Sequence, residues 1–170
     1  MEAYVQFSDA TETTIVASFG CPQDPAIYPN QAKIDSDDVR YQAFVNPAST
    51  LTGARAAQKA TIDAAYLDAI QQSVTFKTAA GVTQTFQADT GSQTILSQAT
   101  QGYQIAGAVP ADFFWKAADN SLVAFTLADL EGLYLAMLAQ GWSAFQKRAT
   151  LKAQIDAATT VAAVQAIIWS

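Results

Sequence analysis

Phe114-Trp115-Lys116-Ala117-Ala118-Asp119-Asn120 is the stretch that decides the fold, together with Leu122-Val123-Ala124-Phe125-Thr126 just after it. Both runs contain aromatic or β-branched residues, and the polar pair Asp119-Asn120 lies between them. Strand-forming runs on either side of polar turn residues predict a β-hairpin. Since a long helical pattern follows at once, the stretch predicts a fold that mixes short strands with helices.

A long helix is predicted directly after this hairpin. Thr126-Leu127-Ala128-Asp129 resembles a capping box, in which each end residue binds the backbone N–H of the other. A heptad-like stripe then recurs in steps of three and four, at Leu127, Leu130, Tyr134, Met137, Gly141, Ala144, Arg148, Leu151 and Ile155. Such a stripe allows coiled-coil packing against a second copy or a fibre. The alternative is a core helix of the same domain, with a second stripe at Leu133, Leu138, Trp142 and Phe145.

A second hairpin and a second helix are predicted upstream. Residues 74–77 and 82–86 flank a turn at Gly81, which is a hairpin signal. Thr90-Gly91-Ser92-Gln93 has the spacing of a capping box and predicts a helix that runs to about residue 105. A short apolar helix over residues 161–169 is predicted to close the chain.

The N-terminal part is predicted to form a β-hairpin, a linker and two helices. Residues 4–7 and 14–19 are β-rich runs separated by polar residues. Residues 20–31 contain Pro22, Pro25 and Pro29, so we expect an extended connector without helix or strand pairing. Acidic residues 35–38 precede a short predicted helix that ends before Pro47. The apolar spacing over residues 53–72 predicts an amphipathic helix.

Together these elements predict the α+β class. We expect an N-terminal β-hairpin arm, a Pro-rich linker, a long amphipathic helix, and a compact C-terminal domain of short β-hairpins and three helices. The corresponding divisions are residues 1–47 for the arm and linker, 48–74 for the connecting helix and 75–170 for the compact domain. A chain of 170 residues is long enough for one good core or for two small packed units.

The chain carries few charges. Charged residues make up 14% of the sequence, against roughly 25% in an ordinary globular domain. A weakly charged exterior favours a chain that buries its surface against partners, because charge is depleted at interface cores; a merely Ala-rich soluble protein is the alternative. The net charge of −6 and the scattered basic residues argue against nucleic acid and membrane surfaces as partners. No signal peptide or transmembrane stretch is recognised, so synthesis in a cytoplasm is expected.

The sequence offers little catalytic or metal-binding chemistry. It contains no His and one cysteine, Cys21, so His-based triads, imidazole ligands and an internal disulfide cannot form. Cys21 is expected to be a free, buried thiol. Asp35, Asp37 and Asp38 form the densest carboxylate group, but the run lacks the glycine of a calcium loop, so a helix cap is the expected role. We therefore predict no enzyme activity, no catalytic residue, no cofactor and no metal site.

The aromatic residues are the best candidates for a binding surface. Aromatic anchors are favoured in binding hot spots and in sugar-stacking surfaces, although large rings also dominate small cores. Core packing of these rings is therefore the alternative interpretation. The candidate partner-binding residues come from the hairpin and the long helix and are Phe114, Trp115, Asp119, Asn120, Tyr134, Met137 and Trp142.

An ordered set of residues carries a resemblance to a known family. The set comprises residues 83–89, Ser92, Ile95, residues 114–123, Thr126, residues 151–159 and Ile167, with the W-x-x-A-D-N turn at Trp115 as its most distinctive part. With this set, about two thirds of the chain, residues 54–169, resembles a domain of unknown function found near the C-termini of tail-fibre and tail-fibre-assembly proteins of tailed bacteriophages. Residues 24–29 and 37–41 also look like the leaders of small phage tail proteins.

The resemblance implies a tail protein and supplies no catalytic residues. One expectation is a structural component of the virion tail, made in the host cytoplasm, that docks on the tail fibre or another tail protein. A second is a tail-fibre assembly chaperone that binds the nascent fibre. A third is a carbohydrate-binding tip module that uses Trp115, with a host surface glycan as a less favoured partner. Self-association also stays open.

Overall fold

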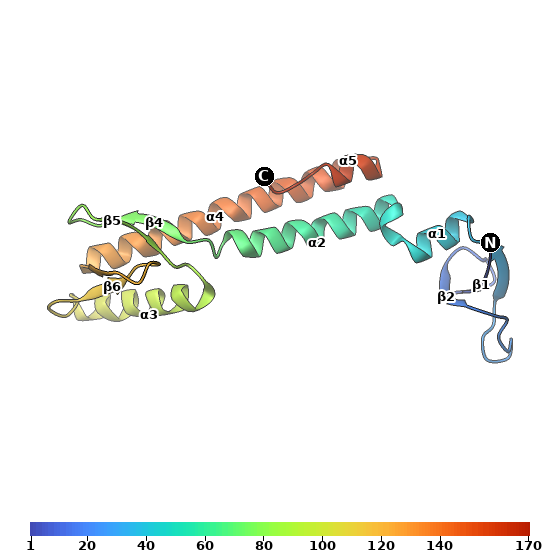
Figure 1. Cartoon of the computed structure of the whole chain (residues 1–170), viewed down its shortest axis with the longest axis horizontal. Helices are drawn as coiled ribbons and strands as arrows, with labels where there is room; N and C mark the ends of the chain where they lie inside the picture. The colour runs from blue at the N-terminus through green and yellow to red at the C-terminus, as the bar shows by residue number, and fades with distance from the viewer. The chain divides into compact units, whose positions relative to one another are not determined.

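The computed structural model describes the whole chain, residues 1–170, and confirms the predicted α+β class (Figure 1). The strands are β1 (Glu2–Phe7), β2 (Ile15–Phe19), β3 (Gln31–Asp35), β4 (Val74–Lys77), β5 (Thr83–Phe86), β6 (Phe114–Lys116) and β7 (Leu122–Ala124). The helices are α1 (Val39–Val45), a 3-10 helix (Pro47–Ser49), α2 (Leu51–Ala69), α3 (Thr90–Ala106), α4 (Leu127–Ala157) and α5 (Val161–Gln165). No helix is long and apolar enough to span a bilayer.

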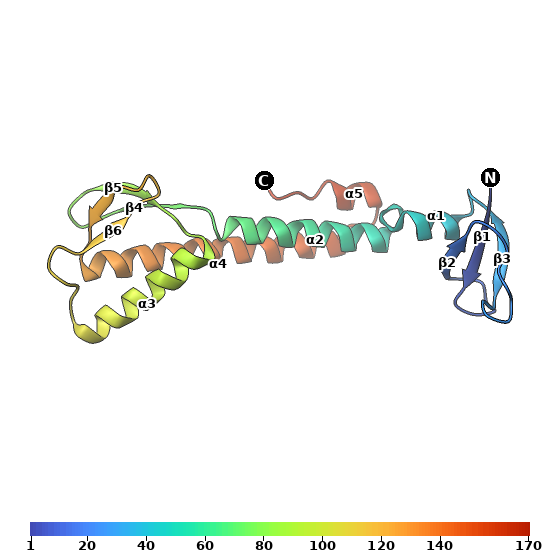
Figure 2. The same ribbon diagram turned by 60° about the horizontal axis from the view of Figure 1, so that its bottom comes forward.

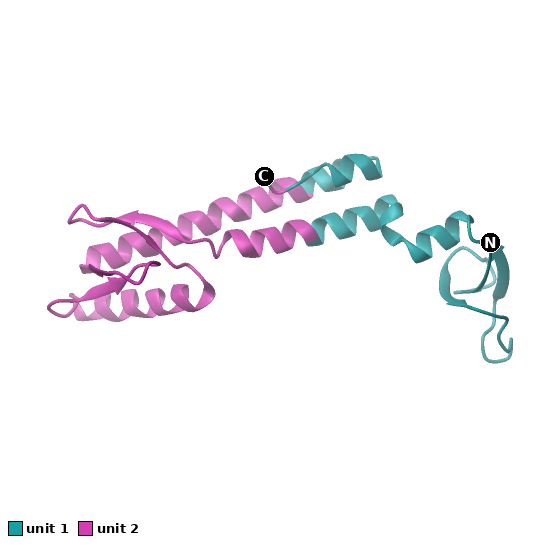
Figure 3. Ribbon diagram, in the orientation of Figure 1, with its two compact units in different colours: residues 1–60, 153–168, 170 teal, residues 61–152, 169 magenta.

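The chain forms two compact units, which Figure 3 shows in different colours. Unit 1 consists of residues 1–60, 153–168 and 170, and unit 2 consists of residues 61–152 and 169. Both α2 and α4 contribute to each unit. The division at residues 47 and 74 that the sequence suggested stays a prediction.

Unit 1 contains a three-stranded antiparallel sheet with the order β2-β1-β3. The central strand β1 alternates, so that Ala3, Val5 and Phe7 are buried on the face that Tyr41 and Phe44 also pack against. The third strand was not predicted. Its sequence, Gln-Ala-Lys-Ile-Asp, contains one large apolar residue and lies at a sheet edge, so it carries almost no strand signal of its own.

The segment between β2 and β3 is a turn-containing loop rather than the predicted extended connector. Pro25 follows Asp24, and the backbone N–H of Ile27 donates to the carbonyl of Asp24 at 3.1 Å, which closes a four-residue turn. Proline is favoured at the second position of such turns because its φ is already set. The turn allows β3 to pair with β1. Cys21 lies in this loop and is exposed, so its predicted burial was wrong.

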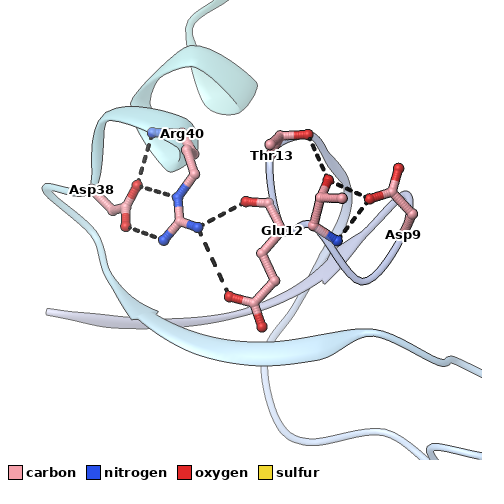
Figure 4. Close-up of polar contacts among 6 residues, drawn as sticks. Asp9, Glu12, Thr13, Asp38 and Arg40 are labelled. Carbon is pink, nitrogen blue, oxygen red and sulfur yellow. Dashed lines mark hydrogen bonds and ion pairs between the residues drawn. The ribbon is translucent and has the colours of Figure 1, made fainter.

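Asp38 begins α1, as the acidic run predicted. Its carboxylate accepts hydrogen bonds from the backbone N–H of Arg40 at 2.9 Å and from the Arg40 side chain at 3.0 and 2.7 Å. The Arg40 guanidinium also donates to the carbonyl of Glu12 at 2.8 Å (Figure 4). Hydrogen bonding from the Arg40 side chain lowers the pKa of Asp38 to about 2. Asp38 and Arg40 therefore attach α1 to the β1–β2 turn, which is a structural role.

Gly53 permits a tight join between the 3-10 helix and α2. A Cβ at this position would overlap the carbonyl oxygen of Pro47, which is backbone and cannot move aside. We predict that Gly53→Ala destabilises unit 1 by about 1–3 kcal/mol. Hydrogen exchange of the amides in residues 51–60 should report the loss, because that segment must shift.

A glycine with open space provides the matched control for Gly53. No atom lies within 4 Å of a Cβ built on Gly102, which is exposed in α3. Gly102→Ala should therefore raise stability by up to about 1 kcal/mol through helix propensity alone. If Gly53→Ala and Gly102→Ala changed stability equally, the close approach of residue 53 to the Pro47 carbonyl would be contradicted.

Unit 2 has two antiparallel hairpins, β4–β5 and β6–β7, which pack on α3 and on the N-terminal part of α4 (Figures 1 and 2). The hairpins are joined where the backbone N–H of Ala118 donates to the carbonyl of Thr85 at 2.8 Å. Their aromatic residues meet in the core. The ring of Phe86 lies 5.3 Å from that of Phe125 and 6.5 Å from that of Phe76.

The helix starts of unit 2 agree with the sequence in one case and differ by a residue in the other. Thr126 and Asp129 form the predicted capping box at α4. At α3 the capping residue is Asp89, which accepts from the backbone N–H of Ser92, rather than the predicted Thr90. Aspartate is at least as good an N-cap as threonine, so α3 is capped by Asp89, one residue before the predicted position. At the C-terminus α5 ends at Gln165, short of the predicted residue 169.

Candidate functional site

The two apolar stripes of α4 have different surroundings. The heptad-like stripe faces the interior, because Leu130, Met137 and Ala144 are buried. That outcome matches the alternative of a core helix within the same domain. The second stripe is buried only at Leu133, whereas Leu138, Trp142 and Phe145 are exposed.

An apolar groove of about 630 Å³ lies beside this exposed stripe within unit 2. Of the predicted partner-binding residues, Tyr134, Met137 and Trp142 all line it. The groove is completed by α2, the residue after it, α3 and the rest of this α4 face, through Tyr66, Ile70, Gln93, Leu138, Gly141 and Phe145. The indole of Trp142 stacks on the ring of Phe145, with centroids 5.7 Å apart and an interplanar angle of 18°.

Side-chain amides hold the end of α2 at the groove. The amide of Gln140 donates to the carbonyls of Ala69 and Gln72 at 3.0 and 2.8 Å. The amide of Gln93 donates to the carbonyl of Ile70 at 2.8 Å. The last carbonyls of a helix, such as that of Ala69, have no partner within the helix, and the carbonyls of Ile70 and Gln72 follow in the turn after it, so these bonds satisfy groups that would otherwise need water. They fix the wall of the groove with uncharged groups.

A charge cluster lies between α2 and α4 next to Tyr66. The carboxylate of Asp63 accepts hydrogen bonds from Arg148 at 2.5 Å and from Lys152 at 2.7 Å. The bonds from Arg148 and Lys152 hold the pKa of Asp63 below its ordinary value. The guanidinium of Arg148 also lies 5.0 Å from the centroid of the Tyr66 ring. The charges of this cluster, which adjoins the groove at Tyr66, are therefore paired with one another.

The structure places Phe114 and Trp115 in a second, smaller pocket of about 400 Å³, lined also by Gln87, Ser92, Ile95 and Lys116. Phe114 is 53% exposed. Trp115 is half-buried, and its ring stacks on Phe125 with centroids 6.4 Å apart. Phe114 presents its ring to solvent, whereas Trp115 contributes mainly to the core.

Asp119 and Asn120 form the turn between β6 and β7. The Asp119 carboxylate accepts from the hydroxyl and the backbone N–H of Ser121 at 2.6 and 2.9 Å, and these bonds lower its pKa. Asn120 has a φ of 69°, a conformation that asparagine tolerates better than most residues. The Asn120 side chain accepts from Lys116 at 3.0 Å. These contacts explain the Asp-Asn pair of the W-x-x-A-D-N motif as turn chemistry.

The groove can bind another molecule chiefly by apolar contact. Its walls are aliphatic and aromatic apart from the hydroxyls of two tyrosines, the indole N–H of Trp142 and the amide of Gln93. No ionisable acid or base other than these tyrosines lines it. Elsewhere in the chain, no group of three or more His, Cys, Asp or Glu residues is placed to hold a metal ion.

Several groove residues were not singled out from the sequence. Tyr66 and Ile70 fall within the predicted amphipathic helix of residues 53–72, and Leu138 and Phe145 were named only as part of the second stripe of the long helix. A usable signal was present, because a helix that packs by one face cannot bury two broad apolar stripes. If α4 packs by one face only, one of its two stripes is exposed, as the structure shows.

The comparisons with known proteins identify a family over most of the chain. Residues 53–168 match the model of a domain of unknown function, DUF4376. No curated protein and no solved structure shows significant similarity. The matched region runs from the first turn of α2 to just beyond α5 and thus contains the groove and both hairpins of unit 2. The chain belongs to the DUF4376 family.

Proposed function

We propose that this chain is a non-enzymatic structural component of a bacteriophage tail, which docks on the tail fibre or on another tail protein. The proposal starts from the resemblance of residues 54–169 to domains of phage tail-fibre and tail-fibre-assembly proteins. It agrees with a surface that has few charges and carries large apolar side chains. Such surfaces are typical of proteins that work by contact with partners.

The observation that carries the proposal is the exposed apolar surface of the β6–β7 hairpin. Phe114, Leu122 and Ile95 are each more than half exposed, at 53%, 62% and 59%. Phe114 and Ile95 line the same pocket, and Phe114 shares a face of the hairpin with Leu122 according to the strand register. We call Ile95, Phe114 and Leu122 the hairpin patch. Phe114 and Leu122 lie in the segment with the most distinctive resemblance, and Ile95 belongs to α3, so the patch is our candidate for the contact with the fibre.

We predict that Phe114→Ser weakens binding to the tail by at least about tenfold, because aromatic anchors dominate interface energies. Purified phage particles lacking the chain would be mixed with labelled protein and bound protein measured after sedimentation. Ile105→Ser provides the matched control, since Ile105 is a large apolar residue of unit 2 that is 90% exposed and lies outside the patch. Equal binding by the two variants would remove the hairpin patch from the proposal.

Mass spectrometry of purified virions separates the structural role from the assembly role. A structural component should be present in mature particles in a fixed ratio to the fibre. Absence from particles, combined with binding to free fibre, would overturn the structural version and leave the assembly chaperone. The carbohydrate-binding version gains no support from Trp115, because one face of its ring is occupied by Phe125.

A further inference from the structure

The middle of α4 lacks charge over an unusually long stretch. No Asp, Glu, Lys or Arg occurs in residues 132–146. Four large apolar residues in this stretch are exposed, namely Leu135 at 62%, Leu138 at 52%, Trp142 at 60% and Phe145 at 45%. Their spacing of three, four and three residues places them along one side of the helix. We call these four residues the outer stripe.

The outer stripe and the groove form one surface. Leu138, Trp142 and Phe145 belong to the stripe and also line the groove, whose lining includes Tyr66 of α2 and Ile70 just after α2. Exposed rings therefore lie directly beside a hollow that is lined by apolar side chains. In a two-fold interface the same patch serves both partners, so the exposed rings of each copy would face the hollow of the other.

Gly141 lies on this surface, and no contact within the chain requires a glycine there. No atom lies within 4 Å of a Cβ built there, whereas a Cβ on Gly132 would meet the Phe76 ring at 2.8 Å. Glycine lowers the stability of a helix interior relative to alanine. Gly141 is half-buried where the heptad-like stripe meets the outer stripe, and it lines the groove. A bare backbone there allows another helix to approach closely, as small residues do at helix–helix contacts.

We propose that this surface binds a second copy of the same chain, with two α4 helices crossing near Gly141 about a two-fold axis. Charge is compatible with this occupant: with a net charge of −6 two copies repel one another over most of their surface, but residues 132–146 bring no like charges together. The neighbouring charges of Asp63, Arg148 and Lys152 are paired within each copy.

The exposed area is enough for a weak dimer. From their exposed fractions, the outer stripe and the Tyr66 side of the groove offer at most about 500 Å² per copy, hence at most about 1,000 Å² in the pair, which reaches the lower limit for a specific interface. We therefore expect a dissociation constant in the micromolar range, about 1–100 µM. The inference is independent of docking on the fibre, which we place on the hairpin patch.

Analytical ultracentrifugation of the full chain from about 1 to about 500 µM tests the proposal. The wild-type chain should pass from monomer to dimer over this range. Trp142→Ser should weaken the dimer by about thirtyfold or more, as expected for a central aromatic anchor. Since Trp142 is 60% exposed, the variant should keep its fold, which circular dichroism would verify. Ile105→Ser should dimerise like the wild type.

Gly141→Ala gives a second test that loss of folding cannot imitate. The variant should have a higher thermal midpoint, because alanine favours the helix, yet should dimerise at least about fivefold more weakly, because its methyl group blocks close approach. Gly102→Ala should raise the midpoint similarly and leave dimerisation unchanged.

Three results would overturn the proposal. The first is a wild-type chain that stays monomeric throughout the concentration range, and the second is a trimer or larger ring in place of a dimer. The third is a dimer that neither Trp142→Ser nor Gly141→Ala weakens. A monomeric chain that loses fibre binding on Trp142→Ser would assign the surface to the fibre instead. Failure of the Phe114→Ser test with a normal dimer would affect only the proposed docking function.

Discussion

Phe86→Ala is expected to lower the free energy of unfolding of unit 2 by about 3–5 kcal/mol, the usual result of removing a fully buried aromatic ring. Phe86 has no exposed surface and packs edge-on against Phe76 and Phe125. Domains are typically stable by only about 5–15 kcal/mol, so this one change removes a large part of the total.

Urea unfolding followed by tryptophan fluorescence would measure the effect of Phe86→Ala. All three tryptophans, Trp115, Trp142 and Trp169, belong to unit 2, so the signal reports that unit. Phe114→Ala provides the control, because it removes the same ring from an exposed site on the neighbouring hairpin and should change stability by less than about 1 kcal/mol. Similar losses in the two variants would contradict the assignment of Phe86 to the core.

Asp129→Ala is expected to cost about 2–4 kcal/mol of unit 2 stability. The Asp129 side chain is only 3% exposed, and it accepts hydrogen bonds from the backbone N–H of Ala79 at 2.7 Å and of Thr126 at 2.9 Å, and from the Thr126 hydroxyl at 2.6 Å. Alanine leaves these donors without an acceptor. The loss would affect the start of α4 and the β4–β5 turn together.

The matched control for Asp129 is Asp89→Ala, which removes the N-cap of α3. Asp89 is exposed, so water can satisfy the freed N–H groups and the loss should be clearly smaller. Asp129→Asn, which keeps one acceptor oxygen, should fall between the wild type and Asp129→Ala. An unfolding midpoint for Asp129→Ala equal to that of Asp89→Ala would show that the buried hydrogen bonds do not stabilise the unit.

The effect of Asp129 should depend on pH in a defined direction. Burial raises the pKa of its carboxyl, but the hydrogen bonds from Thr126 and Ala79 outweigh burial and leave the pKa below the ordinary value of 3.8. A pKa that is lower in the folded than in the unfolded chain stabilises the fold above the unfolded value, and that stabilisation is lost as the pH falls through the folded value. The stability difference between wild type and Asp129→Asn should therefore be constant near pH 7 and shrink below about pH 4.

Much of the secondary structure could be predicted because its signals are local. The Thr126–Asp129 capping box, Asp38 at the start of α1 and the polar turn at Asp119 each act over a few residues. Strand β3 could not be predicted, since its five residues are held by pairing with β1 rather than by their own preferences. The exposure of Cys21 depends in the same way on a loop that β3 brings into place.

The candidate site could be predicted only in part. Tyr134, Met137 and Trp142 were chosen as aromatic or apolar residues of a long helix, and the structure brings them together in one groove. Tyr66 joins them from α2, far away in the sequence, and no spacing rule connects it to α4. Their role in binding a partner stays a prediction, as does that of Phe114 in the hairpin patch.

By itself the sequence determined the α+β class, the order of the helices and hairpins, and the existence of two apolar stripes on α4. These follow from periodicity, capping and turn chemistry, which depend on neighbouring residues along the chain. Only the tertiary structure decided which stripe is buried and which faces solvent, and that Gly141 has open space above it. Periodicity states which side chains share a face of a helix, whereas the partner of each face is set by the packing of distant segments.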